Sequence, residues 1–134
     1  MHKKLSNVEF SYFIGQKVEE VNTEKNIVFG MAFESGFLTI ECPWRIRCDN
    51  EVAIGYSDVR HSAGKFSHKN AEQILLGKRI VNIFHFEQIS DLVVEFENGI
   101  YLELFHDSSY YEGWQLGTEK GLYLFTLPGG SYSD

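Results

Sequence analysis

The sequence has little cysteine, little proline and no long hydrophobic run. Its 134 residues include two cysteines and two prolines. Two thiols cannot complete a zinc site alone, and the spacing of Cys42 and Cys48 matches no zinc motif, so we expect reduced thiols and no metal. No stretch approaches a membrane span, and Glu9 interrupts the start of the chain, which disfavours a signal-peptide core. We therefore expect a cytoplasmic protein that does not enter the membrane.

Basic residues are also scarce, chiefly in the second half. The formal net charge is −7. Residues 68–134 hold ten acidic and four basic residues, whereas residues 1–67 hold nine and eight. No run of Lys or Arg could follow a phosphate backbone, which argues against nucleic-acid binding. The acidic half would attract a basic protein partner, although an acidic surface also simply keeps a protein in solution.

What the chain does contain is an internal repeat. Each copy has an opening glycine, a Phe-Glu-x-Gly turn and then a tryptophan. The opening glycines are 62 positions apart, the turn glycines 63 and the tryptophans 70. These landmarks are Gly15, Gly36 and Trp44 in the first copy and Gly77, Gly99 and Trp114 in the second.

The repeat predicts a mainly β fold. Short runs of β-branched and aromatic residues alternate with turn residues in both copies. We expect two similar antiparallel β-meanders, packed as a sandwich or partly open barrel, because each copy has one apolar face to cover. The chain is expected to be a single domain, 1–134, with repeats at about 15–56 and 77–127 and a linker plus one short helix at 57–76.

The two copies differ by one residue in phase. Leu38 and Ile40 lie two and four places after Gly36, which we expect to take a positive φ in a tight turn. The matching apolar residues of the second copy lie one, three and five places after Gly99. A one-residue slip reverses the faces of a strand, so a bulge or shifted register is predicted.

Three further segments have weaker patterns. Ser67 is expected to cap a helix that Gly77 ends. Residues 1–14 have no clear pattern, but Val8, Phe10, Tyr12 and Ile14 alternate within them and could form a strand. Residues 128–130, Pro-Gly-Gly, are expected to end the sheet and turn the tail away.

The copies differ most before the tryptophan, and this difference gives the candidate functional surface. Only Cys42 and Pro43 separate Glu41 from Trp44, whereas residues 105–113 precede Trp114. Loops on a rigid sheet are where function concentrates. The candidate binding residues are His106, Asp107, Tyr110, Tyr111, Glu112 and Trp114.

Catalytic and metal-binding interpretations of this segment are disfavoured. His106, Asp107 and Ser108 are the residue types of a hydrolase triad, but they are adjacent, and no Gly-x-Ser-x-Gly elbow is present. No histidine spacing supports a metal site with His85. We expect no catalytic residue and no cofactor. The two tryptophans are read as core anchors, with ligand stacking as the alternative.

The carboxy-terminal segments Tyr111–Leu116 and Leu127–Gly130, with Gly121 between them, resemble the signature of an uncharacterised bacterial family of small proteins. Gly15 and the Pro43-Trp44 pair are similar to that family as well. The resemblance covers most of the chain and implies no established activity. Small acidic proteins of this kind resemble immunity or accessory proteins encoded beside secreted toxins.

Three functions remain open from the sequence. The first is a non-catalytic protein-binding module, such as an immunity-type inhibitor, that uses the acidic half and the tyrosines. The second is a small-molecule-binding sandwich or barrel in which Trp114 lines a cavity. The third, a hydrolase, is the least favoured. Exposed edge strands also make a homodimer an option.

Overall fold

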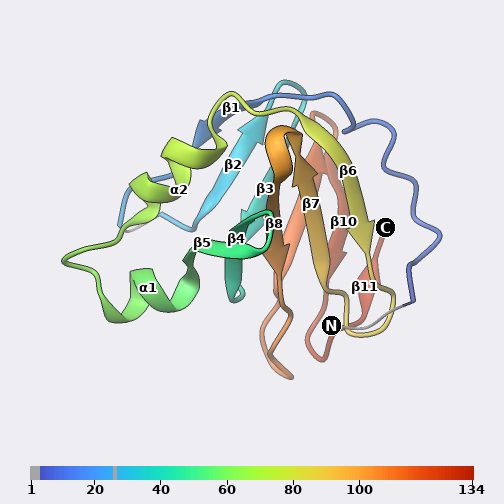
Figure 1. The fold of residues 1–134 in the computed structure, drawn as a ribbon. Helices are drawn as coiled ribbons and strands as arrows, with labels where there is room; N and C mark the ends of the chain where they lie inside the picture. Colours follow the sequence, from blue (N-terminus) through green and yellow to red (C-terminus); the bar gives the residue numbers. More distant parts are fainter. Residues whose placement is uncertain (1–3, 26) are drawn as a thin grey trace.

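The computed structural model describes residues 4–25 and 27–134. Figure 1 shows two β-sheets, with both helices on the same side of the molecule. The strands are β1 (Val18–Val21), β2 (Gly30–Phe33), β3 (Gly36–Ile40), β4 (Trp44–Cys48), β5 (Glu51–Gly55), β6 (Ile80–His85), β7 (Leu92–Phe96), β8 (Ile100–Leu104), β9 (Trp114–Thr118), β10 (Gly121–Thr126) and β11 (Tyr132–Ser133). The helices are α1 (Tyr56–His61), α2 (His68–Leu75) and the 3-10 turn η1 (Glu97–Gly99).

The two sheets confirm the predicted mainly β fold, and they also exchange strands between the copies. One sheet has the order β1-β2-β3-β9-β10-β11 and the other β5-β4-β8-β7-β6. Each sheet therefore combines the first three strands of one copy with the last two of the other. Because β3 pairs with β9 and β4 pairs with β8, neither copy can complete its sheet alone.

The openings of the two copies meet at a pseudo-twofold axis. Lys17 and Arg79, which are equivalent positions, form an antiparallel bridge with each other. Gly15 N donates to Ile80 O, and the equivalent Gly77 N donates to Val18 O. Both glycines have positive φ, 89° and 81°. Residues with a Cβ rarely adopt this backbone conformation, whereas glycine adopts it readily. The shared glycine openings thus have the same structural role.

The one-residue difference in phase is absorbed in a turn. Phe33 pairs directly with Gly36 across a two-residue turn, whereas Phe96 pairs with Ile100 across the three residues of η1. The expected positive φ of Gly36 is wrong, because this residue already belongs to β3. It is close-packed instead: a Cβ at this position would lie 2.7 Å from the carbonyl oxygen of Gly117.

The connecting segments differ from expectation in two places. Helix α2 forms as predicted, and the amide of Ser67 donates to Asn70 Oδ1 at 2.9 Å. The predicted linker also contains α1, whose first turn is closed by a bond from Gly55 N to Asp58 Oδ2. The tail does not turn away, because β11 pairs with β10.

The amino-terminal segment is not a strand where described. Leu5 makes a single bridge to Phe86, and residues 11–15 form turns that bury Phe13 completely. Residues 1–3 lie outside the described part of the chain. Over the described residues, no helix has the length and apolar character needed to cross a membrane.

Candidate functional site

The loop of residues 105–113 is fixed at both ends. Phe105 N donates to Pro43 O, and Glu41 N donates to Gly113 O at 2.8 Å. These bonds tie the loop to the short connection between β3 and β4. Gly129 N donates to Ser108 O at 2.9 Å, which holds the middle of the loop against the tail. These hydrogen bonds fix the position from which the tip of the loop projects.

The tip carries two exposed tyrosines. Tyr110 is 76% exposed and Tyr111 69% exposed. Their rings contact each other edge-to-face, with centroids 4.9 Å apart. The backbone amides of both residues donate to Ser108 Oγ, so this hydroxyl shapes the tip. Asp107 and Glu112 are exposed on either side of the pair.

His106 lies inside the molecule, away from the exposed tip. It is 7% exposed, and its amide donates to Asp91 Oδ1. Its Nε2 lies 2.8 Å from the carbonyl oxygen of Ser108, which fixes the proton on Nε2, since a carbonyl only accepts. Nδ1 has no hydrogen-bond partner among the described residues. Neither the His106 ring nor Asp107 activates the Ser108 hydroxyl, so these three residues do not form a triad.

Trp114 also lies in the core. It is fully buried, and its Nε1 donates to the carbonyl oxygen of Ser90 at 2.9 Å. The rings of Trp114 and His85 contact each other edge-to-face, with centroids 5.7 Å apart. Of the six candidate residues, the structure therefore brings Asp107, Tyr110, Tyr111 and Glu112 to the surface and places His106 and Trp114 behind them.

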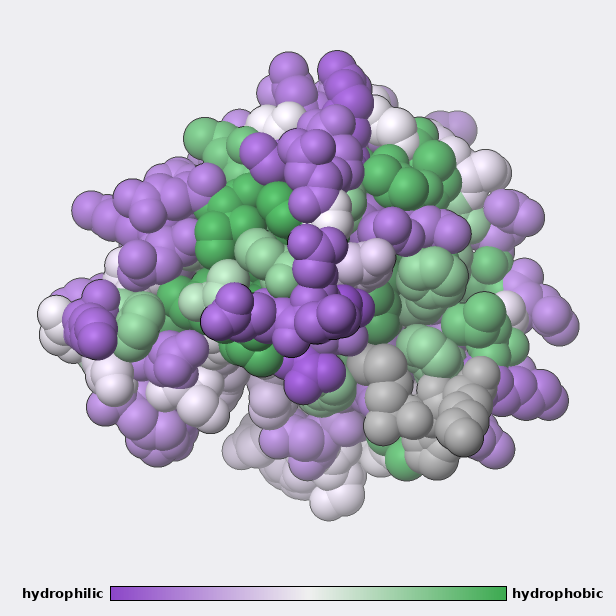
Figure 2. Space-filling view, in the orientation of Figure 1, coloured by the Kyte–Doolittle hydropathy of each residue, from purple (hydrophilic) through white to green (hydrophobic). Residues whose placement is uncertain are grey.

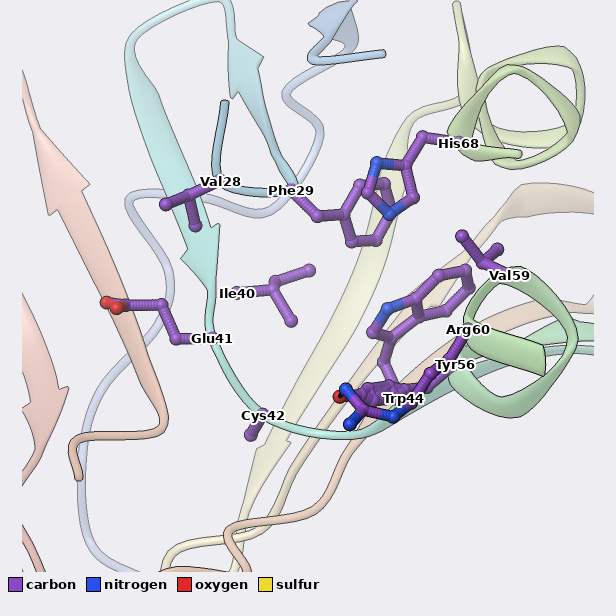
Figure 3. A pocket seen from close by; sticks show the side chains of 10 residues that line it. All are labelled: Val28, Phe29, Ile40, Glu41, Cys42, Trp44, Tyr56, Val59, Arg60 and His68. Carbon is purple, nitrogen blue, oxygen red and sulfur yellow. Dashed lines mark hydrogen bonds between the residues drawn. The ribbon is translucent and has the colours of Figure 1, made fainter. Parts of the chain in front are cut away.

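A second site, which the sequence analysis did not single out, lies beside Trp44. A pocket of about 370 Å³ opens between the short connection after β3 and helix α1. Figure 3 shows Phe29, Trp44 and His68 with their rings gathered on one side of it. Trp44 and the brevity of the connection were visible in the sequence, but the helix that completes the pocket was not predicted.

Two titratable groups of this pocket, Cys42 and His68, have pKa values that burial shifts toward the uncharged form. Burial raises the pKa of the Cys42 thiol to about 12, and burial also lowers the pKa of His68. Cys42 is therefore a poor nucleophile at neutral pH, because the thiolate is the reactive form. Both cysteines are free. In residues 4–25 and 27–134, no group of three or more His, Cys, Asp or Glu is placed to hold a metal ion.

Comparison with known proteins places the chain in a family. Residues 11–133 match the family of unknown function DUF6188, and the chain belongs to that family. No curated protein and no solved structure matches it.

Proposed function

We propose that this protein is a non-catalytic binding module that holds a basic protein surface with the tip of its 105–113 loop. Membership of a family of unknown function supplies no activity, so the proposal rests on the geometry of the loop. The observation that carries it is the pair Tyr110 and Tyr111, which are exposed, in mutual contact and fixed by Ser108. Tyrosine buries a large area at low entropic cost when a partner covers it.

The charge around the pair supports a basic partner. Residues 80–119 contain eight acidic residues and no Lys or Arg. Asp107 and Glu112 flank the tyrosines, and Glu41 is exposed next to the base of the loop. Carboxylates around an aromatic centre speed the encounter with a basic surface. Figure 2 shows the loop protruding below the sheets, separated from the α1 side by a notch.

An immunity-type inhibitor is the biological role that fits these features best. Such a protein would act in the bacterial cytoplasm, and its partner would be a toxin with a basic surface that the tyrosines cover. The resemblance of the carboxy-terminal segments to a family of small bacterial proteins supports this role. Covering a surface needs no catalytic group, and the triad residue types of the loop are not arranged for catalysis.

The test is a pull-down with the purified chain as bait, followed by binding measurements on the captured basic protein. The double variant Tyr110→Ala/Tyr111→Ala should lose that partner, whereas Tyr12→Ala, which alters a tyrosine 45% exposed elsewhere, should retain it. Glu112→Lys should slow association, and Glu119→Lys, in the turn that follows β9, should do so less. Equal retention by all four variants would eliminate the loop as the binding surface.

A second copy of the chain is the alternative partner, and it would bind at the β5 edge and not at the 105–113 loop. Strand β5 is an edge of its sheet, and Val52 on it is 53% exposed. An open edge can pair with the same edge of another molecule. Light scattering distinguishes the two cases: a dimer that Val52→Lys dissociates would assign self-association to β5 and leave the loop for other partners.

A further inference from the structure

The pocket beside Trp44 exists because the two copies connect β3 to β4 and β8 to β9 differently. Three residues, 41–43, make the first connection, and nine residues, 105–113, make the second. The short connection leaves open the end of the sandwich next to Trp44, and α1 and α2 form the opposite wall. The resulting volume of about 370 Å³ lies in the size range of pockets that hold small organic ligands.

The walls of the pocket are aromatic. The rings of Phe29 and His68 stack with centroids 4.4 Å apart, and those of Phe29 and Trp44 lie 4.6 Å apart. Val28, Ile40 and Val59 add aliphatic surface. A planar ring gains most from such walls, because offset stacking adds to the burial of its faces. His68 stays neutral at pH 7, since burial lowers its pKa, so it adds no charge to the wall.

Two side chains at the pocket, Trp44 and Arg60, have N–H groups that can donate further hydrogen bonds. Trp44 Nε1 makes no hydrogen bond within the described chain, although Trp44 is only 5% exposed. In Figure 3 this nitrogen points into the pocket toward Ile40. Arg60 donates to the hydroxyl of Tyr56 at 2.9 Å, but no carboxylate of the described residues lies within ion-pair distance of it. An indole N–H and a guanidinium are hydrogen-bond donors only, so both can bind an acceptor group on a ligand.

The charges at the pocket mouth favour an anion at one side. Arg60 is the only Lys or Arg among the described lining residues, and Glu41 is the only Asp or Glu. Figure 3 shows the carboxylate of Glu41 directed away from the aromatic rings, on the side opposite Arg60. The guanidinium therefore meets a bound group without a competing carboxylate between them, and guanidinium binds carboxylate through paired hydrogen bonds.

We propose that this pocket binds a small planar aromatic carboxylate. Its ring lies against Phe29 and Trp44, Trp44 Nε1 donates a hydrogen bond to an acceptor on the ligand, and the ligand's carboxylate pairs with Arg60. This site is separate from the tip of the 105–113 loop, and neither assignment depends on the other.

The experiment is a nitrogen-edited NMR titration of the full chain with naphthoate, indole carboxylate and the uncharged naphthamide. The two tryptophans give two indole N–H signals, of which Trp114 serves as an internal control because its proton is bonded to Ser90 O. The expected result is a saturable shift of the Trp44 signal with the carboxylates, little shift of the Trp114 signal, and weaker binding of the amide. Absence of saturable binding by both carboxylates at millimolar concentration, or equal binding of the amide, overturns the proposal.

Two variants and two controls test the placement. Val59→Phe, which fills the pocket, should remove the shift, whereas Val81→Phe, on an exposed position of β6, should keep it. Arg60→Gln should weaken naphthoate binding about tenfold through loss of a charge-assisted contact, and should leave the amide unchanged. The double loop variant Tyr110→Ala/Tyr111→Ala should bind naphthoate normally. Unaltered binding by Val59→Phe would place the ligand elsewhere and refute the site.

Discussion

Trp44 and Trp114 occupy equivalent positions in the two copies and have different surroundings. Trp114 is fully buried, its indole N–H is bonded to Ser90 O, and His85 packs on its ring. Trp44 lines a pocket, and its N–H has no hydrogen-bond partner in the described chain. Both tryptophans belong to the hydrophobic core, as predicted, but Trp114 is sealed within it whereas Trp44 also forms a pocket wall.

The difference comes from the segments that follow the shared strands. After β10 the tail returns as β11, and Tyr132 packs on His85 with ring centroids 4.5 Å apart. After β5 the chain forms α1 and α2, which stand beside the open end of the sandwich without filling it. Repeated strands provide the scaffold, and unequal connections decide where a surface becomes available.

The largest expected effect is on stability when each tryptophan is removed. Trp114→Ala should cost about 4 kcal/mol, because it leaves a closed cavity and an unpaired carbonyl. Trp44→Ala should cost about half as much, since part of its surroundings is already open. Urea unfolding of the two variants measures the difference. Equal losses of stability would mean that Trp44 packs as tightly as Trp114 in spite of the pocket.

The next effect concerns the glycine before Trp114. A Cβ at residue 113 would lie 2.5 Å from His106 Nδ1 and 3.0 Å from Thr126 Oγ1. Gly113→Ala should therefore destabilise the fold by about 2 kcal/mol through overpacking. Gly64→Ala is the control, because a Cβ there meets nothing within 4 Å. Thermal unfolding compares them, and a neutral Gly113→Ala would show that the sealed end of the sandwich tolerates expansion.

Acid should lower the stability of the fold through His85, which packs against Trp114. Burial lowers the pKa of His85 from 6.5 to about 4. Between these values the unfolded chain binds a proton that the folded chain does not, so stability falls as the pH drops from 6.5 to 4 and changes little from this group above 6.5. Taken in full, this shift corresponds to about 3 kcal/mol, and local relaxation around the protonated ring should reduce the loss to about 2 kcal/mol.

The test compares the free energy of unfolding of the wild type with that of His85→Phe between pH 4 and pH 6.5. His85→Phe should flatten the profile, leaving a smaller slope from His68, whose pKa burial also lowers. His61→Gln, which alters an exposed histidine, should leave it unchanged. An equally steep profile in His85→Phe would assign the acid sensitivity to other groups.

The smallest expected effect is that of the loop tip on stability. Tyr110→Ala/Tyr111→Ala should change the free energy of unfolding by less than about 0.5 kcal/mol, because both side chains are mostly exposed. A loss of partner binding with unchanged stability would then belong to the surface itself. A large destabilisation would instead show that the tyrosine pair holds the loop in place.

Several features of the site were predictable because they depend on local pattern. The unequal lengths before the tryptophans marked residues 105–113 as a loop, and polar residues within it indicated exposure. The burial of His106 was not predictable, because its partner Asp91, just before β7, and Thr126 of β10, which lies on the other side of Gly113, are distant in sequence. Helix α1 was missed because its stretch is short and polar, and none of its residues is buried.

By itself the sequence determined the mainly β class, the doubling and the equivalence of Gly15 with Gly77, since alternation and backbone freedom act within a few residues. Only the tertiary structure decided that the copies exchange strands through the β3–β9 and β4–β8 pairings. It also decided that Trp114 is sealed while Trp44 faces a pocket. These outcomes depend on segments that are distant in sequence, and the burial of a side chain is set by whatever neighbours the whole fold brings to it.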